Sequence, residues 1–386
     1  MKGWEVKRGA ANGRQSTYNP AMLKRLYIDN FRCFVNFEYK PERKQLLLGA
    51  NGSGKSSLLD AILFVKWFIT GDENDFTQKT RTRWDPGPHQ VVELEAELEG
   101  KTFLYRLEIR YSPEEQLPSV NLEKLTVSGT PVFEFASGEV HFFGNGGSQV
   151  SNLKWKATES ALRLAQQSNP HVGRFLEWLD TVHCFQIDPY FDVMEEKADT
   201  EDALPEYNLS NLAPWYRHLL LVDPEGNARF LSELKEALNN FLALRFSQED
   251  DGVRKLRADF LAQGKKRITL SLSELSDGQR MLMGLYMVLH FVIAKGHTVI
   301  LDEPDNFVSL REIQPWLHAA EDAVLENKGQ LILISHHPEI LNYWAREFGL
   351  LFFREENGQV RTKPYSEVAD TGLEPAETIA RGWGDE

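Results

Sequence analysis

The sequence predicts an α/β fold that carries an antiparallel β arm and an inserted helical lobe. A glycine-rich string stands between a short apolar strand and an amphipathic helix, and two β-branched apolar runs follow late in the chain; these features indicate an α/β core. Apolar and polar residues alternate over 91–111, which predicts the arm. The chain is therefore expected to divide into a flexible leader (1–20), a first core lobe with the arm (21–150), the helical lobe (151–295) and the completion of the core (296–386).

The expected elements follow one another in a mixed order. Strands are expected at 23–30 with a continuation to 34, 45–48, 122–127, 132–135, 140–143, 182–187, 242–246, 267–272, 298–301 and 331–334, besides the hairpin over 91–111. Helices are expected at 55–69, 157–167, 173–179, 209–221, 228–241, 278–294 and 311–325. No heptad array or internal repeat accompanies them.

Bulk composition is that of an ordinary globular chain. Of 386 residues, 26% are charged and 42% hydrophobic, which leaves ample apolar material for a core. The formal net charge of −14 argues against a surface that coats nucleic acid broadly, although a local basic groove is compatible with it. Cys33 and Cys184 match neither a disulfide framework nor a metal motif, so we expect two reduced, buried thiols.

Membrane and secretory segments are not expected. The longest apolar runs, such as 283–294, fall short of the ~20 residues that span a bilayer. The polar, mildly basic segment 1–20 lacks the apolar region of a secretory signal. These observations predict a cytoplasmic protein.

The string GANGSGKS at 49–56 matches the phosphate-binding loop G-x-x-x-x-G-K-[ST]. Its glycines let backbone N–H groups point inward as an anion nest, which the N-terminus of the next helix reinforces. Lys55 would reach the β- and γ-phosphates, and the Ser56 hydroxyl would coordinate Mg²⁺. The residues expected to bind nucleotide here are Gly49, Asn51, Gly52, Ser53, Gly54, Lys55, Ser56 and Ser57.

Two later strands end in residues that suit phosphate chemistry. Asp302 closes the strand at 298–301 and would hold Mg²⁺ directly or through water. Glu303 stands one residue further, where a carboxylate can polarise an attacking water as general base. After the strand at 331–334, His336 is expected to contact the γ-phosphate; we prefer it to His337 because it comes first after the strand and Ser335.

The string LSDGQ at 275–279 looks like the ABC signature motif. Ser276, Gly278 and Gln279 stand at the start of the long helix, where a hydroxyl and free N–H groups suit a γ-phosphate. Ser276 is equally suited to cap that helix, and the two roles are compatible.

These motifs, in this order, resemble the ABC-type ATPase heads of the SMC/RecF/OLD group. The LSDG string resembles in particular the compact AAA-type core family that includes OLD-like and Septu-type defence ATPases. The resemblance implies a P-loop NTPase head of ABC type that uses ATP and Mg²⁺ and forms a homodimer or higher oligomer, because one chain's phosphate loop is completed by another chain's signature motif.

The same resemblance assigns further residues. Asn30 and Arg32 would lie beside the base and phosphates, and Gln186 would couple Mg²⁺ to the helical lobe, with Gln78 as the alternative. Asp305 and Asn306 stand where the family's D-loop lies. The family's histidine is missing there, so no D-loop role carries over to Ser309.

The resemblance and the chain length also limit the function. Without a coiled coil the chain does not resemble a full SMC protein, and the roughly 50 residues after His336 are too few for a nuclease domain. We expect an ATP-hydrolysing switch in anti-phage defence or DNA repair; the alternative is an ATP-locked scaffold that assembles a partner nuclease or toxin. DNA contact is conceivable at Lys79, Arg81, Arg83 and Trp84 and at 265–267, though solvated loops are the simpler interpretation.

Overall fold

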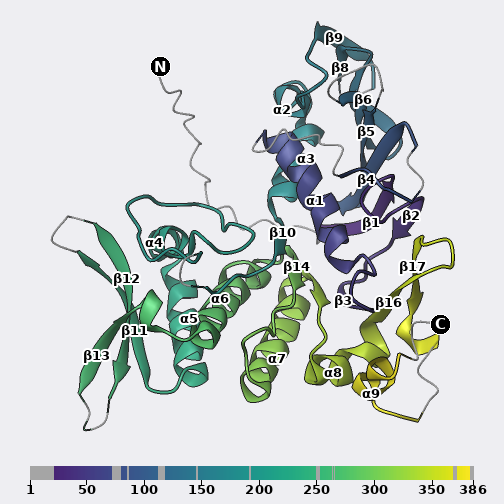
Figure 1. Ribbon diagram of the computed structural model, residues 1–386. Coiled ribbons are helices and arrows are strands. Elements are labelled where there is room, and N and C mark those ends of the chain that lie inside the picture. Colours follow the sequence, from purple (N-terminus) through teal and green to yellow (C-terminus); the bar gives the residue numbers. More distant parts are fainter. Residues whose placement is uncertain are drawn as a thin grey trace.

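The computed structural model describes residues 21–71, 80–84, 87–111, 118–144, 147–190, 193–248, 253–262, 264, 266–367 and 372–382. Two large sheets share one end of the molecule, and a lobe of helices with a small sheet forms the other end (Figure 1). The expected leader over 1–20, and residues Gln78, Lys79 and Lys265, lie outside the described residues.

A six-stranded sheet forms the α/β core that the motifs predict. Its strand order is β10-β14-β15-β3-β16-β17, and every neighbouring pair is parallel except β16 and β17. The strands are β3 (Lys44–Leu48), β10 (Val182–Phe185), β14 (Thr298–Asp302), β15 (Gln330–Ile334), β16 (Gly349–Arg354) and β17 (Val360–Pro364). Because β14, β15 and β3 run parallel, their carboxyl ends meet at one edge of the sheet.

Both faces of this sheet are buried. Ile300 and Ile332 pack with the first helix, whereas Val299 and Leu331, one position earlier in each strand, pack with helices on the opposite face. This alternation on two apolar faces is typical of a covered parallel sheet. The helix on the first face is α1 (Lys55–Thr70), and those on the second are α6 (Asp277–Phe291), α7 (Leu310–Asn327) and α8 (Pro338–Phe348).

The expected β arm is an eight-stranded antiparallel sheet that packs against α1. Its order is β2-β1-β4-β5-β6-β7-β8-β9. Its strands are β1 (Met22–Asp29), β2 (Phe37–Tyr39), β4 (His89–Leu98), β5 (Lys101–Arg110), β6 (Ser119–Val127), β7 (Thr130–Ala136), β8 (Glu139–Phe143) and β9 (Gln149–Lys154). The helices α2 (Leu162–Ala165) and α3 (Pro170–Asp180) share its core. The expected boundary at residue 150 therefore falls inside this unit, which extends to Asp180.

The second lobe contains both helices and strands. Figure 1 shows α4 and α5 beside the three-stranded sheet β11-β12-β13, with α6 leading back to the core. The elements are α4 (Leu212–Val222), α5 (Pro224–Ala237), β11 (Phe241–Gln248), β12 (Arg254–Leu261) and β13 (Arg267–Ser271). The sequence did not predict β12. Charged residues separate its buried side chains Leu256, Ala258 and Phe260, so the segment does not resemble an apolar strand.

Several other expectations need correction. The first strand ends at Asp29, and 30–34 forms a tight turn in which Asn30 and Arg32 have φ of 57° and 49°. The helix expected over 157–167 is only the short α2, and the helix expected to reach 241 ends at Ala237. Also unforeseen were β2, β9, β16, β17, α8 and α9 (Pro375–Ala380).

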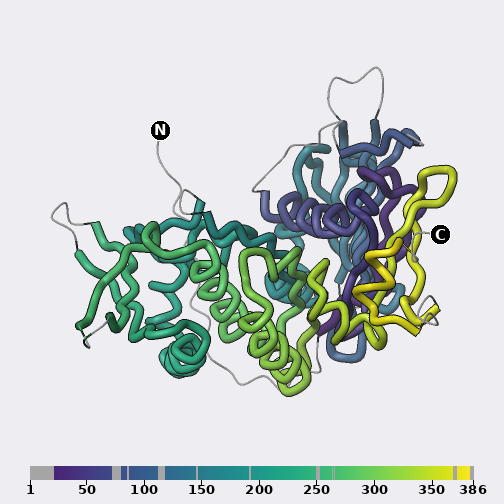
Figure 2. The backbone as a smooth tube through the Cα atoms, turned by 60° about the horizontal axis from the view of Figure 1, so that its bottom comes forward, coloured from purple at the N-terminus to yellow at the C-terminus, as the bar shows by residue number. Residues whose placement is uncertain are grey.

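The β16–β17 hairpin lies beside β2, as the tube in Figure 2 shows, and Arg361 donates from there to the Val35 carbonyl at 3.1 Å.

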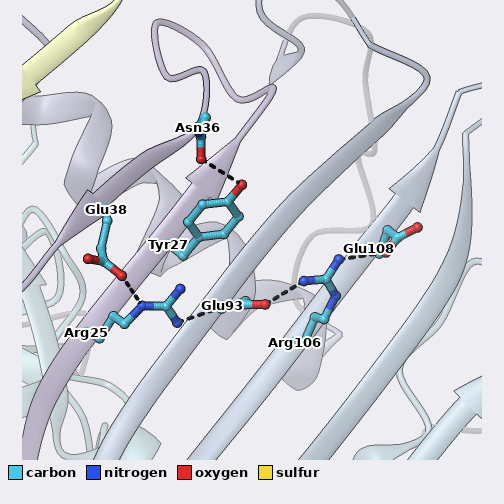
Figure 3. A network of polar contacts seen from close by, with 7 residues as sticks. All are labelled: Arg25, Tyr27, Asn36, Glu38, Glu93, Arg106 and Glu108. Carbon is cyan, nitrogen blue, oxygen red and sulfur yellow. Dashed lines mark hydrogen bonds and ion pairs between the residues drawn. The ribbon is translucent and has the colours of Figure 1, made fainter.

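Charged side chains form a ladder across four strands of the antiparallel sheet (Figure 3). Glu93 on β4 accepts from Arg25 on β1 at 2.8 Å and from Arg106 on β5 at 2.5 Å. Arg25 also bonds Glu38 at 2.5 Å, and Arg106 bonds Glu108 at 3.0 Å. Opposite charges thus face each other across each strand pair, an arrangement that stabilises the strand register.

Two further expectations concern cysteines and membrane spans. Cys33 and Cys184 are both buried and form no disulfide, as the sequence predicts. Among the described helices, none combines the length and the apolar character that crossing a bilayer requires.

Candidate functional site

A pocket of about 480 Å³ lies at the carboxyl ends of β3, β14 and β15. The register explains the convergence, because Asp302 pairs with Ile334, and Ile334 pairs with Leu47 just before the glycine-rich loop. The pocket is lined by Arg32, Cys33, Asn51, Gly52, Gly54, Lys55, Ser56, Ser57, Arg81, Arg83, Trp84, Asp302, Glu303, Ile334, His336 and Arg354.

Two positions of the loop require glycine, because their backbone has a positive φ and because a side chain would not fit there. Gly49 has φ of 133°, and a Cβ there would lie 2.2 Å from the Phe352 carbonyl oxygen. Gly54 has φ of 109°, and a Cβ there would lie 2.9 Å from the Cys33 sulfur. The loop is thus held between the backbone of β16 and the turn that follows β1. Gly49 and Ser53 do not line the pocket, so they contribute to the conformation of the loop rather than to the pocket surface.

Lys55 is buried and contacts the loop itself. Its ammonium donates to the carbonyl oxygens of Gly49 at 2.7 Å and Ala50 at 3.1 Å. Because a phosphate group is a stronger partner for an ammonium than a carbonyl oxygen, these bonds hold Lys55 near the position from which it can turn to a nucleotide.

Ser56 and Asp302 both line the pocket and contact each other. The Ser56 side chain hydrogen-bonds to the Asp302 carboxylate, while burial raises the pKa of Asp302 from its ordinary value. A hydroxyl and a carboxylate oxygen fit Mg²⁺, which takes few protein ligands and completes its shell with waters and phosphates. Nowhere in the described parts do three or more His, Cys, Asp or Glu side chains form a metal cluster. The donor set therefore fits a nucleotide-borne Mg²⁺.

Glu303 stands at the pocket in an unusual backbone conformation. Its φ is 49°, and its N–H donates to the Ile334 carbonyl at 2.8 Å, which fixes it to the neighbouring strand. The Asn306 amide donates to the Glu303 carboxylate at 2.6 Å. Sequence reasoning assigned no side-chain role to Asn306, although its place three residues after Glu303 is compatible with this contact.

The two histidines after β15 have different environments. His336 lines the pocket, and burial, with the nearby Lys55 charge, lowers its pKa. Both effects favour the neutral imidazole. The His337 ring instead accepts the Glu339 N–H at 3.3 Å and caps α8.

The signature residues lie away from the pocket of their own chain. The Ser276 hydroxyl accepts the Gln279 N–H at 3.3 Å, and the Gln279 side chain accepts the Ser276 N–H at 2.9 Å, which makes a capping box at the start of α6. Ser276 is exposed. A Cβ on Gly278 would lie 2.6 Å from the Phe307 carbonyl oxygen, so the signature packs against the loop that follows Glu303.

Other expected site residues are placed unequally. Arg32 lines the pocket and pairs with Asp60. Asn30 is buried outside the pocket lining and donates to the carbonyls of Gly87 at 2.8 Å and His89 at 2.7 Å. Gln186 is exposed directly after β10, at the same edge as Asp302, but does not line the pocket.

The pocket includes residues for which the sequence suggested another role or none. Arg81, Arg83 and Trp84, which the sequence suggested for DNA contact, line this pocket. Arg354 gave no sequence signal, because it ends a strand that the periodicity did not predict. Its guanidinium donates to the Gly52 carbonyl oxygen at 2.6 and 3.1 Å.

Two family models match parts of this chain. A family model described as "AAA domain, putative AbiEii toxin, Type IV TA system" matches residues 46–342, and one described as "P-loop containing region of AAA domain" matches 23–67. No curated protein matches in sequence.

Solved structures show a shared fold. The Smc head bound to the C-winged helix domain of ScpA has a TM-score of 0.51 at 12% identity, covering 89% of this chain and 99% of that one. The SMC head domain from Thermotoga maritima has a TM-score of 0.45 at 16% identity, covering 89% of this chain and 98% of that one. The likeness to the ScpA-bound head, which covers most of this chain, shows that the two proteins share a fold.

Proposed function

We propose a function from one premise: the chain belongs to the family described as "AAA domain, putative AbiEii toxin, Type IV TA system", an SMC/RecF-like group of ABC-type ATPases. In our proposal it binds and hydrolyses ATP, and two chains enclose two ATP–Mg²⁺ between them. Hydrolysis then controls an effector protein or a DNA-related process in cytoplasmic anti-phage defence or DNA repair.

The observation that carries this proposal is the convergence of Lys55, Glu303 and His336 on one pocket. Lys55 neutralises the β- and γ-phosphates, and neutral His336 donates a hydrogen bond to a γ-phosphate oxygen. Glu303 orients a water and takes its proton as the water oxygen bonds to the γ-phosphorus and the bond to ADP breaks. Ser56 and Asp302 would hold Mg²⁺, which would supply charge neutralisation for the phosphates when bound.

The position of the signature motif supports the dimer. Ser276 is exposed at the N-terminus of α6 and does not line the pocket formed by its own chain. A helix N-terminus with an exposed hydroxyl is suited to a phosphate. A second chain would present that helix end to the open side of the ATP pocket, and the loop at Phe307 would connect the two sites.

Replacing Glu303 with Gln tests the general base. We expect Glu303→Gln to keep ATP affinity but to slow hydrolysis by about 100-fold or more, the usual size of a general-base effect. An ATP-bound dimer should then accumulate in light scattering. Glu326→Gln on the exposed side of α7 is the matched control and should hydrolyse ATP at the wild-type rate. Unchanged hydrolysis in Glu303→Gln would contradict the assignment.

The contact between Asn306 and Glu303 favours a second candidate function. The Asn306 amide occupies a Glu303 carboxylate oxygen that would otherwise accept from the attacking water, so turnover in the isolated chain would be slow. The protein would then act as an ATP-locked scaffold that assembles a partner nuclease or toxin; the Smc head, bound to a ScpA domain, gives an example of such docking. Steady-state ATPase assays with and without DNA or partner separate the two functions, since only the switch should turn over steadily.

A further inference from the structure

We propose that Trp84 and Arg354 form the platform on which the nucleotide base stacks, at the mouth of the phosphate pocket. This inference rests on the proposed binding of ATP and names the residues that would hold the part of the ligand outside the phosphate loop.

Trp84 lies where its aromatic ring is accessible to a ligand in the pocket. It lines the pocket together with the glycine-rich loop, and half of its surface (50%) is exposed. Other tryptophans of the chain, such as Trp215, Trp316 and Trp344, are fully buried in the core. An indole in this position offers a large flat face to a ligand while its phosphate-binding neighbours lie deeper.

Arg354 supports the indole from one side. Its guanidinium carbon lies 4.6 Å from the centre of the Trp84 ring, the geometry of a cation–π contact. The same guanidinium donates to the Gly52 carbonyl at 2.6 and 3.1 Å and to the Gly358 carbonyl at 2.8 Å. These bonds fix Arg354, so one face of the indole is held against a rigid group.

The β16–β17 hairpin closes one edge of the ring. Gly358 has φ of 81°, and a Cβ there would lie 2.4 Å from Cδ1 and Nε1 of Trp84. One face of the indole lies against Arg354 and one edge lies against Gly358, and half of the residue surface remains exposed. This leaves a stacking surface for a planar ring.

Two consequences follow for the ligand. Stacking on an indole depends on the π-face rather than on hydrogen-bond pattern, so ATP and GTP should bind similarly and pyrimidine triphosphates more weakly. In addition, Arg354 bonds the Gly52 carbonyl, so the base platform and the phosphate loop share one side chain. Binding of the base would thereby help to order the loop.

The experiment compares ATP with inorganic tripolyphosphate, which carries the phosphates without a base. Dissociation constants are measured by calorimetry for the wild type, Trp84→Ala and Trp84→Phe. We expect Trp84→Ala to weaken ATP about tenfold or more, to leave tripolyphosphate unchanged, and to be largely rescued by Trp84→Phe. Tyr343→Ala, a half-exposed aromatic (47%) outside the pocket lining, is the control and should change neither.

Fluorescence gives a second readout. Because the chain has 9 tryptophans, the Trp84 signal is the difference between wild type and Trp84→Phe. ATP should quench that difference signal and tripolyphosphate should not. Equal weakening of both ligands by Trp84→Ala, or no weakening of ATP, would overturn the platform.

If the proposed ATP binding itself were wrong, the same binding measurements would give a different pattern. Lys55→Ala should lose both ATP and tripolyphosphate, and retained binding of both in that variant would refute the phosphate loop itself. If wild-type protein binds tripolyphosphate through Lys55 but Trp84→Ala leaves ATP affinity intact, the ATP site stands and only the platform fails.

Discussion

At the scale of single residues, Gly54 shows that the phosphate loop depends on residues that are distant in the sequence but close in space. Its backbone lies in the left-handed region, and its missing side chain leaves room for the Cys33 sulfur. Any side chain there meets both a conformational penalty and a clash.

Replacing Gly54 with Ala should therefore disrupt the loop. We expect a loss of roughly 1–3 kcal/mol in the free energy of unfolding and strongly reduced ATP binding, measured by urea unfolding and calorimetry. Gly52→Ala is the matched control: Gly52 also has a positive φ of 78°, but a Cβ there meets nothing within 4 Å. The interpretation fails if both variants lose stability equally, because only Gly54→Ala adds a clash.

At the scale of elements, one buried carboxyl joins the antiparallel sheet to the segment before α2. Glu123 on β6 accepts from the Tyr105 hydroxyl at 2.9 Å, the Ser160 hydroxyl at 2.5 Å and the Ala161 N–H at 3.3 Å. Burial raises the pKa of Glu123 to about 7, although these hydrogen bonds oppose the shift. The junction thus titrates near neutral pH.

This raised pKa predicts that stability falls as pH rises. Between the ordinary value of 4.5 and about 7, the unfolded chain releases a proton that the folded chain keeps. The free energy of unfolding should therefore drop by about 3 kcal/mol over that window relative to Glu123→Gln, and remain level above it. Urea unfolding of both proteins between pH 5 and pH 8 measures this gap.

The control for that series is Glu97→Gln, a substitution at a half-exposed carboxylate of β4 (48%) paired with Lys24. Its gap from wild type should stay nearly constant over the same pH range. A constant gap for Glu123→Gln as well would mean that Glu123 ionises normally in the folded protein.

At the scale of the whole molecule, the phosphate loop and the signature motif lie at different places on one chain. The phosphate loop and the acidic strand end form the pocket, while Ser276 points to solvent from α6. In the proposed function the site is completed by association of two chains, so the oligomeric state is the measurement that tests it.

An arginine at position 276 should block association without affecting the pocket. In a Glu303→Gln background with ATP, light scattering should report monomer for Ser276→Arg and dimer for the parent. ATP affinity of the monomer should be unchanged. Ser151→Arg, on the exposed strand β9, is the control and should dimerise normally. An intact dimer in Ser276→Arg would refute the composite site.

The sequence alone determined the α/β core, the phosphate loop and the strand ends at Asp302, Glu303 and His336. Each of these follows from spacing within a few residues: a strand that runs into a glycine-rich loop, or an apolar run that ends in an acid or a histidine. Local periodicity also predicted the meander of the antiparallel sheet, because alternation requires only one strand and its turn.

The tertiary structure decided everything that depends on contact between distant segments. Arg354 holds Gly52 and Trp84, although no spacing rule connects positions so far apart. Asn30 donates to the carbonyls of Gly87 and His89, and no short-range pattern indicates these partners either. Packing fixes such partners in three dimensions, and short-range sequence patterns carry no record of them.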